Sequence, residues 1–249
     1  MINYIANLFK NKNSDTNKLS NEIKRIHRLI PQDFGGGCSH EKALIMSMLI
    51  KNFQLKKSVD IGVYRGRSLF PQAIAHKLFT DGIVYGVDPY SNQAAIQNDR
   101  PDLKDQLDQF IKTTDFQALY NAVSSIITEN NFQNNAVLVR KKSTDAVTDF
   151  KKDKIYFGLV HIDGNHDTKY VMEDVKNYMP LLDDTSFIVL DDISWDSVKP
   201  AYSLLEEELV FIDKLINHGN DFAVFGKGLS KEELAEGKDL FKKIKSYSA

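Results

Sequence analysis

The chain has 249 residues, 42% of them hydrophobic, which is enough for one α/β domain with a substantial core, and no apolar run approaches a membrane span. A net charge of −2 gives no reason to expect a nucleic-acid partner, and one cysteine, Cys38, excludes an intramolecular disulfide. The first residues lack the long apolar stretch of a signal peptide, so we expect a cytoplasmic protein without a transmembrane segment.

Residues 1–50 are predicted to form a helical segment ahead of the main domain. Four apolar residues of its first turns share one helical face: Ile2, Ile5, Leu8 and Phe9. We expect this face to dock on the domain or on a second subunit of a homo-oligomer, and a membrane-surface helix is the alternative. A second helix is expected at residues 21–29. A hinge-like loop at 35–37 then precedes a helix that Ser39 can cap.

A glycine loop follows the first predicted strand. The motif D-I-G-V-Y-R-G-R-S occupies residues 60–68, and the apolar positions after it suit a helix. A second strand, residues 83–87, ends in Asp88, and 88 − 66 = 22 residues separate this acid from Gly66. At this spacing a carboxylate can bind the two hydroxyls of a ribose.

The glycine loop departs from two better-known nucleotide loops. A dinucleotide fingerprint needs G-x-G-x-x-G, whereas Val63 and Tyr64 follow Gly62 here. A phosphate-binding P-loop needs four residues between its glycines and then Lys, whereas this chain has three residues and Arg67. The loop therefore suits a nucleoside that carries an amino acid rather than a pyrophosphate. A purely structural turn is the alternative.

The stretch 90–131 is long and polar, with helices expected at 103–111 and 116–127. We interpret it as an insertion that forms either a lid over an acceptor or a surface decoration. A third strand, residues 136–139, leads to Ser143 and Thr144.

Two further strands end in acids. The run 156–162 precedes Asp163, and the run 187–190 precedes Asp191 and Asp192. Parallel strands meet ligands at their carboxyl ends, and clustered carboxylates suit Mg²⁺. Because successive strand side chains point oppositely, Asp191 and Asp192 converge only if the strand ends there. Solvated turn acids are the alternative.

The end of the chain is predicted to contain a helix at 198–209 and a hairpin of strands 210–216 and 222–225, with its turn near 218–220. A C-terminal helix is expected within 229–249. The main domain would then span residues 51–228.

These motifs resemble class I S-adenosylmethionine-dependent methyltransferases. They are most similar to the metal-dependent sugar O-methyltransferases of macrolide and aminocoumarin biosynthesis and the cephalosporin-hydroxylase-like group. The resemblance covers about residues 39–227, through the glycine loop, Gly86-Val87-Asp88, H-I-D-G-N-H at 161–166, and Asp191-Asp192. It implies an α/β fold with a Rossmann-like, doubly wound, seven-stranded sheet whose last strand is reversed.

The resemblance also implies the site. S-adenosylmethionine would contact eight residues: Asp60, Gly62, Tyr64, Gly66, Ser68, Asp88, Ser143 and Thr144. Mg²⁺ would be held by Asp163, Asp191 and Asp192. The catalytic base would be His166, because Asn165, where some relatives have an acid, carries an amide that cannot serve as a base. Alternatively, His166 caps the next helix or binds substrate. His161 is expected to be a buried structural histidine.

The implied activity is Mg²⁺-dependent O-methylation of a sugar or glycosylated small molecule. The alternatives are a non-catalytic partner subunit that binds the cofactor, a catechol-type O-methyltransferase and an oxidoreductase. Polar side chains of the insertion favour a carbohydrate acceptor: Asn92, Gln93, Gln97, Asn98, Arg100, Gln106 and Gln109.

Overall fold

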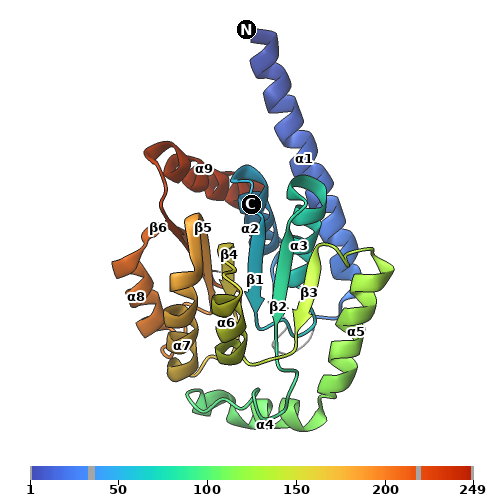
Figure 1. Cartoon of the computed structure of the whole chain (residues 1–249), viewed down its shortest axis with the longest axis vertical. Helices are drawn as coiled ribbons and strands as arrows, with labels where there is room; N and C mark the ends of the chain where they lie inside the picture. The colour runs from blue at the N-terminus through green and yellow to red at the C-terminus, as the bar shows by residue number, and fades with distance from the viewer. Residues whose placement is uncertain (1, 33–36, 217–219, 248–249) are drawn as a thin grey trace.

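Seven strands form one mixed sheet in the computed structural model, which describes residues 2–32, 37–216 and 220–247, with side chains from residue 15 onward (Figure 1). In the order β3-β2-β1-β4-β5-β7-β6 the first five strands are parallel, and β7 runs antiparallel to both β5 and β6. This confirms the predicted doubly wound sheet with a reversed last strand. The strands are β1 (Lys57–Ile61), β2 (Ile83–Val87), β3 (Ala136–Val139), β4 (Phe157–Ile162), β5 (Leu182–Asp191), β6 (Val210–Leu215) and β7 (Phe222–Lys227).

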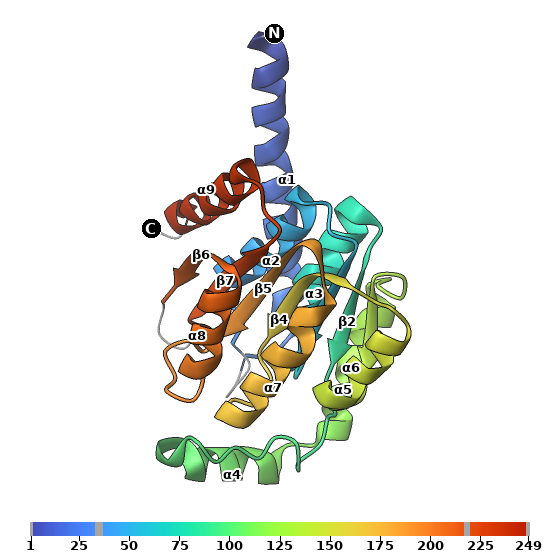
Figure 2. The same cartoon turned by 60° about the vertical axis from the view of Figure 1, so that its left-hand side comes forward.

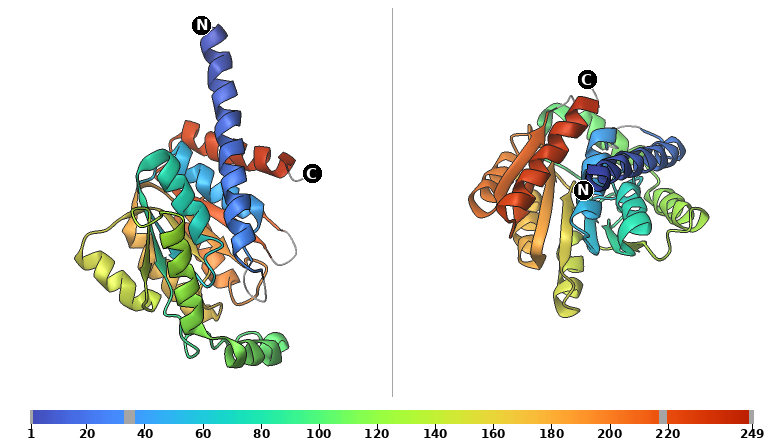
Figure 3. Two further views of the ribbon diagram at one scale, coloured as in Figure 1. Left: turned by 90° about the vertical axis from the view of Figure 1, so that its right-hand side faces the viewer. Right: turned by 90° about the horizontal axis from the view of Figure 1, so that it is seen from above.

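Helices cover both faces of the sheet, as the view from above shows (Figure 3). One face carries α1 (Ile2–Leu29), α2 (His40–Asn52), α3 (Leu69–Ala75), α5 (Phe116–Glu129) and α9 (Lys231–Tyr247). The other carries α6 (Ser143–Lys152), α7 (Thr168–Tyr178) and α8 (Lys199–Glu208). Short turns of helix are η1 (His76–Thr80), η2 (Pro101–Leu103) and η3 (Met179–Leu181). Among the described helices, none is long and apolar enough to cross a membrane.

The alternation of side chains along each strand places Asp60 and His161 on the same face of the sheet. Val59 and Ile61 of β1 pack against α6 and α7, so Asp60 between them faces α3. The same alternation in β4 turns His161 to the face that Asp60 occupies, and the two residues are direct neighbours in the parallel register.

The N-terminal segment differs from the prediction, because one continuous helix, α1, replaces two. Leu19, Ile23 and Ile26 are fully buried in the core shared with α2 and α3. The first turns of α1 extend beyond the rest of the molecule (Figure 1). The predicted apolar face of those turns consists of side chains outside the described part of the structure. Residues 35–36 of the predicted hinge and 218–219 of the predicted hairpin turn also lie outside it.

The stretch 90–131 divides into two parts. Helix α5 belongs to the core, where Leu119, Val123 and Ile127 are buried. Helix α4 (Lys104–Thr113) instead lies across the end of the sheet where the parallel strands finish, and buries only Leu107 (Figure 2). The segment 91–114, which includes α4, is therefore the part that can form a wall over the strand ends. We call it the α4 segment.

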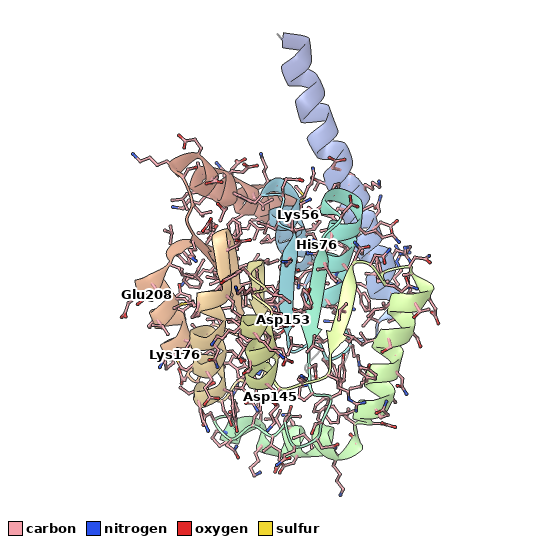
Figure 4. All side chains as sticks on the ribbon, in the orientation of Figure 1. Lys56, His76, Asp145, Asp153, Lys176 and Glu208 are labelled. Carbon is pink, nitrogen blue, oxygen red and sulfur yellow. The ribbon has the colours of Figure 1, made fainter. Side chains whose placement is uncertain are left out.

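Charged side chains mostly project outward, as Lys176 on α7 and Glu208 on α8 illustrate (Figure 4). Lys42 on α2 is different, because its side chain is fully buried. It is the only lysine or arginine in the buried class among the described residues. A buried ammonium needs an acidic partner, and this partner lies in the site described next.

Candidate functional site

A pocket of about 790 Å³ opens at the carboxyl ends of the parallel strands. The glycine loop, the strand ends and the α4 segment form its walls. Ten of the twelve predicted site residues line it: Gly62, Tyr64, Ser68, Asp88, Ser143, Thr144, Asp163, His166, Asp191 and Asp192. Asp60 and Gly66 do not line the pocket, and they support the loop from behind.

Gly62 lies at the closest approach between the glycine loop and the end of β4. Its φ is +88°, and a Cβ atom there would lie 1.9 Å from the backbone oxygen of Asp163. Only glycine fits this contact, because any side chain would displace the backbone of a predicted metal ligand. Gly66 has φ +86°, and a Cβ atom there would meet the ring of Phe70.

Asp60 is fully buried beneath the loop and accepts hydrogen bonds from three side chains. Its Oδ2 atom accepts from Ser68 Oγ at 2.8 Å. Its Oδ1 atom lies 2.6 Å from His161 Nδ1 and 3.3 Å from Gln72 Nε2. Because a carboxylate can only accept, Nδ1 of His161 carries the proton. Asp60 thus connects the glycine loop with β4.

Asp88 accepts hydrogen bonds from backbone N–H groups with both of its carboxylate oxygens. Tyr64 N donates to Oδ2 at 2.9 Å and Tyr90 N donates to Oδ1 at 2.7 Å. Both tyrosines have positive φ, +48° and +47°, a conformation that costs free energy and is common at binding sites. Burial raises the pKa of Asp88. With the backbone N–H groups of Val63, Tyr64 and Tyr90 directed at it, the carboxylate still has a lone-pair site left to accept from a ribose hydroxyl.

The acidic strand ends converge as the sequence required. Strand β5 ends at Asp191, and Asp192 takes φ +51°, which turns its side chain out of the strand alternation. Two sets of side chains could each hold a metal ion, and both contain Asp163. Within each set the ligand atoms lie within 4.8 Å of one another. The inner set is His161, Asp163 and Asp191, and the outer set is Asp163, His166 and Asp192. The three predicted metal ligands are thus divided between these sets.

Lys42 contacts the acidic cluster and was not predicted from the sequence. Its Nζ atom bonds to Asp191 Oδ2, lies 3.8 Å from Asp163 Oδ2, and donates to the Gly37 oxygen at 2.9 Å. Burial lowers the pKa of Lys42, but the two carboxylates outweigh burial and raise it. The one indication in the sequence was that Lys42 lies next to the apolar residues of the helix predicted after Ser39.

The ionisation of the two carboxylates depends on Lys42. Burial and the neighbouring Asp163 raise the pKa of Asp191, whereas Lys42 opposes this rise. For Asp163, burial is outweighed by Lys42 and His166, which together lower its pKa. Lys42 therefore favours the charged form of both acids.

His166 lies between two carboxylates. Its Nε2 atom is 2.9 Å from Asp192 Oδ2 and 3.3 Å from Asp163 Oδ1. Its ring centroid is 4.9 Å from that of Trp195. Burial alone would lower the pKa of His166, but the hydrogen bonds to Asp163 and Asp192 raise it to about 10. The ring is therefore protonated at neutral pH in this arrangement.

Asp174 is a second pocket residue that was not predicted from the sequence. It is 3% exposed, it lines the pocket, and its Oδ1 atom has no hydrogen-bond partner among the described residues. Burial raises its pKa to about 7, although a hydrogen bond from Ser143 opposes the rise. It lies beside Gly164, where a Cβ atom would be 3.4 Å from Asp174 Oδ2.

The α4 segment is attached directly to the loop that carries His166. Asp167 Oδ1 accepts from the backbone N–H groups of Asn98 and Asp99, at 2.7 and 2.8 Å. Asn165 Nδ2 donates to the oxygen of Ile96 at 2.7 Å. Asn165, where some relatives have an acid, thus connects the two segments.

The wall formed by the α4 segment is partly polar and partly apolar. Of its seven predicted polar residues, Gln93, Gln97 and Asn98 line the pocket, while the other four do not. Apolar and aromatic side chains contribute the rest: Ile96, Leu103, Leu107, Phe110 and Phe116, with Trp195 opposite.

Comparison with known proteins identifies a family. A model described as a methyltransferase domain matches residues 59–193, more than half of the chain, from the glycine loop to the acidic end of β5. No curated protein matches the sequence.

Solved structures share the fold at low sequence identity. An O-methyltransferase from Bacillus cereus in complex with SAH gives a TM-score of 0.57 at 13% identity, covering 84% of this chain and 90% of its own. The O-methyltransferase TomG from Streptomyces achromogenes, involved in tomaymycin synthesis and in complex with SAM, gives 0.56 at 12%, covering 80% and 91%. A methyltransferase from Geobacter sulfurreducens gives 0.53 at 11%, covering 85% and 90%.

Proposed function

Since the chain belongs to the methyltransferase-domain family, we propose that it is an S-adenosylmethionine-dependent O-methyltransferase that uses Mg²⁺ to methylate a hydroxyl of a sugar or glycosylated small molecule. The observation that carries this proposal is the position of His166. It lies in the same pocket as the glycine loop and Asp88, and it is bonded to two carboxylates of the acidic cluster. The residues proposed to bind the cofactor and the proposed base therefore line one cavity.

The residues present fit S-adenosylmethionine. Gly62 lets the glycine loop pack directly against the backbone of Asp163, so that the proposed cofactor loop and the acidic strand end border the same pocket. Asp88 retains acceptor capacity for the ribose, and the unpartnered Oδ1 of Asp174 suits an amino-group donor such as that of adenine. The carboxylates of the pocket also favour a cationic sulfonium and ammonium over a pyrophosphate.

The acidic cluster fits a divalent cation. Its donors are mainly carboxylate oxygens, which Mg²⁺ prefers, and Asp191 Oδ1 is buried without a partner among the described residues. We assign Asp163, Asp191 and Asp192 as the ligands, with Asp191 using this free oxygen.

When bound, S-adenosylmethionine supplies an electrophilic methyl group, and the cation lowers the cost of deprotonating an aliphatic hydroxyl. In its neutral form His166 receives the hydroxyl proton at Nδ1, which has no partner among the described residues. Its Nε2–H donates to Asp163 and Asp192, which hold the ring and stabilise its charged form. Because these two carboxylates also raise the pKa of His166, any interaction that withdraws their charge lowers this pKa and makes the neutral ring available as the base at neutral pH. Contact with Trp195 limits the motion of the ring.

The mixed wall of the α4 segment favours an amphipathic acceptor. Gln93, Gln97 and Asn98 can bond to sugar hydroxyls, while Leu107 and Phe110 suit an apolar portion. This combination favours a glycosylated small molecule over a bare sugar. The sugar of such a molecule would contact the polar residues, and its apolar portion would contact the apolar residues of the same pocket.

Two measurements test the proposal. Thermal shift and calorimetry should detect binding of S-adenosylmethionine but not NAD, and Asp88→Ala should weaken binding about tenfold or more through lost charge-assisted hydrogen bonds. Radiolabelled methyl transfer should then be measured with glycosides, sugar nucleotides and catechols, in EDTA and in Mg²⁺. NAD binding in place of S-adenosylmethionine would reject the assignment. Methyl transfer that persists in EDTA would reject the proposed Mg²⁺ dependence. Transfer to catechols alone would reject the proposed sugar acceptor.

A further inference from the structure

Lys42 places a permanent positive charge inside the acidic cluster. Its Nζ atom bonds to Asp191, lies 3.8 Å from Asp163, and is held from behind by the Gly37 oxygen. The side chain has no exposed surface, and it comes from α2, outside the strands that carry the carboxylates. The ammonium therefore lies where the inner set of ligands would otherwise attract another cation.

The inner set is not fully satisfied by this ammonium. Asp191 Oδ1 and His161 Nε2 are both buried, and neither has a hydrogen-bond partner among the described residues. Asp191 is 5% exposed and His161 has no exposed surface, so neither of these atoms is positioned to hydrogen-bond with bulk water. The cluster thus combines an internal cation with free ligand atoms.

Charge counting shows what the lysine changes. Asp163, Asp191 and Asp192 carry three negative charges when all are ionised, and Lys42 reduces the total to two. The ring of His166, when protonated, reduces it to one. Without Lys42, the same three carboxylates would attract a cation more strongly, because like charges within a few ångströms repel in a buried site.

We propose that Lys42 is a positioning residue that acts as an internal cation: it shares Asp191 with the metal site and weakens the binding of divalent ions there. The inference rests on the metal site of the proposed function. Two observations support it: Lys42 bonds to Oδ2 of Asp191, and Oδ1 of Asp191 has no hydrogen-bond partner among the described residues.

The direction of one affinity change separates this role from simple orientation. Loss of a residue that only orients a ligand typically weakens metal binding about 10–100-fold. Loss of a competing positive charge strengthens it, and the gain grows with the charge of the ion. Lys42→Met removes both the charge and the hydrogen bond, whereas Lys42→Gln removes the charge but keeps a donor for Asp191.

The experiment is a Mn²⁺ titration of the cofactor-free, full-length protein, followed by electron paramagnetic resonance at pH 8. Both variants should bind Mn²⁺ about tenfold or more tightly than the unmodified protein, with a larger gain for Tb³⁺ measured by luminescence. Lys42→Arg should change affinity by less than about threefold, as should Lys199→Met, which alters an exposed lysine paired with Asp196.

Weaker binding in Lys42→Gln would overturn the inference, and so would equal gains for Mn²⁺ and Tb³⁺ or unchanged affinity. If Lys42→Met does not fold, the Gln variant decides alone, because it retains a partner for Asp191. Methyl transfer is not measured here. If the Lys42 variants bind Mn²⁺ more tightly but the protein shows no methyl transfer, Lys42 is an internal cation and the proposed enzyme activity is rejected. If the protein transfers methyl groups but the variants bind Mn²⁺ with unchanged affinity, the activity stands and the role of Lys42 is rejected.

Discussion

The Nδ1 atom of His161 lies 2.6 Å from Oδ1 of Asp60, and neither side chain has any exposed surface. This bond joins β4, which ends in the acidic cluster, to β1, which ends in the glycine loop. Asp60 also holds Ser68 of that loop, so that one carboxylate connects the proposed cofactor and metal regions.

Asp60→Ala should damage both regions, because it removes the acceptor of three buried donors, of which only Gln72 Nε2 keeps another, the Ser68 oxygen. We expect the free energy of unfolding to fall by about 3 kcal/mol or more, and affinity for S-adenosylmethionine to fall with it. Urea denaturation and calorimetry measure these changes. Asp153→Ala, at an exposed position, should change neither. A stable Asp60→Ala protein with normal cofactor affinity would contradict this account.

Gly62→Ala tests the contact between the glycine loop and Asp163. The new Cβ atom would lie 1.9 Å from a backbone oxygen at φ +88°, so we expect a loss of about 3 kcal/mol or more in unfolding free energy. Gly237→Ala is the matched control. A Cβ atom there meets Ile212 at 3.4 Å inside α9, and alanine should stabilise the helix by about 0.5–1 kcal/mol. If the two substitutions change the free energy of unfolding equally, the glycine loop can shift to accommodate a side chain and the contact with Asp163 is not restrictive.

His166→Ala should reduce turnover by about 10²–10⁴-fold while affinity for S-adenosylmethionine stays unchanged, since the ring is assigned a proton-transfer role. Added imidazole should restore part of the activity by occupying the vacated space. Initial rates with and without imidazole, together with calorimetry, measure both effects. A loss below about tenfold would place the base elsewhere.

The repeating core of the fold was predictable from the sequence, because parallel strands buried on both faces give continuous apolar runs. The observed limits of β2 and β3 are the predicted ones. Strand β5 begins at Leu182 rather than at residue 187, since the exposed Asp183 and Asp184 conceal its start. The polar stretch at 10–18 likewise suggested a break, whereas the structure has one continuous helix, α1.

The site was predictable where its residues share short motifs. Lys42 was not, because its partner Asp191 lies 149 residues away and no local pattern links them. Asp174 was hidden for a different reason: acids are common on amphipathic helices, and only the fold shows that this one faces inward.

Asp174→Asn should change how stability depends on pH. Burial raises the folded-state pKa of Asp174 to about 7, so the folded protein retains a proton that the unfolded chain releases near pH 4. Its contribution to stability therefore falls as pH rises from about 4 to 7, by roughly 2–4 kcal/mol. The neutral amide avoids this loss, and the variant should gain stability relative to the unmodified protein at pH 8 but not at pH 4.5. Denaturation at both values measures the difference. Asp183→Asn, at an exposed position, should show no such trend, and a pH-independent effect at Asp174 would refute the assignment.

The last prediction concerns the attachment of the α4 segment. Asp167→Ala removes the acceptor for the backbone N–H groups of Asn98 and Asp99, so that the wall over the acceptor region loses its anchor. We expect hydrogen exchange in residues 91–114 to increase and the KM for the acceptor to rise about tenfold, because positioning is lost. Affinity for S-adenosylmethionine should be unchanged, since Asp88 and the glycine loop do not contact Asp167.

Asp102→Ala is the control for that experiment, because it alters an exposed acid of the same segment that pairs only locally with Arg100. It should leave the acceptor KM and hydrogen exchange at 98–99 unchanged. If Asp167→Ala increases exchange but the acceptor KM stays the same, the α4 segment does not shape the acceptor site. The argument for an enclosed, partly polar acceptor pocket would then fail, while the cofactor assignment would stand. A parallel loss of cofactor affinity would instead show that the segment supports the whole pocket rather than the acceptor wall alone.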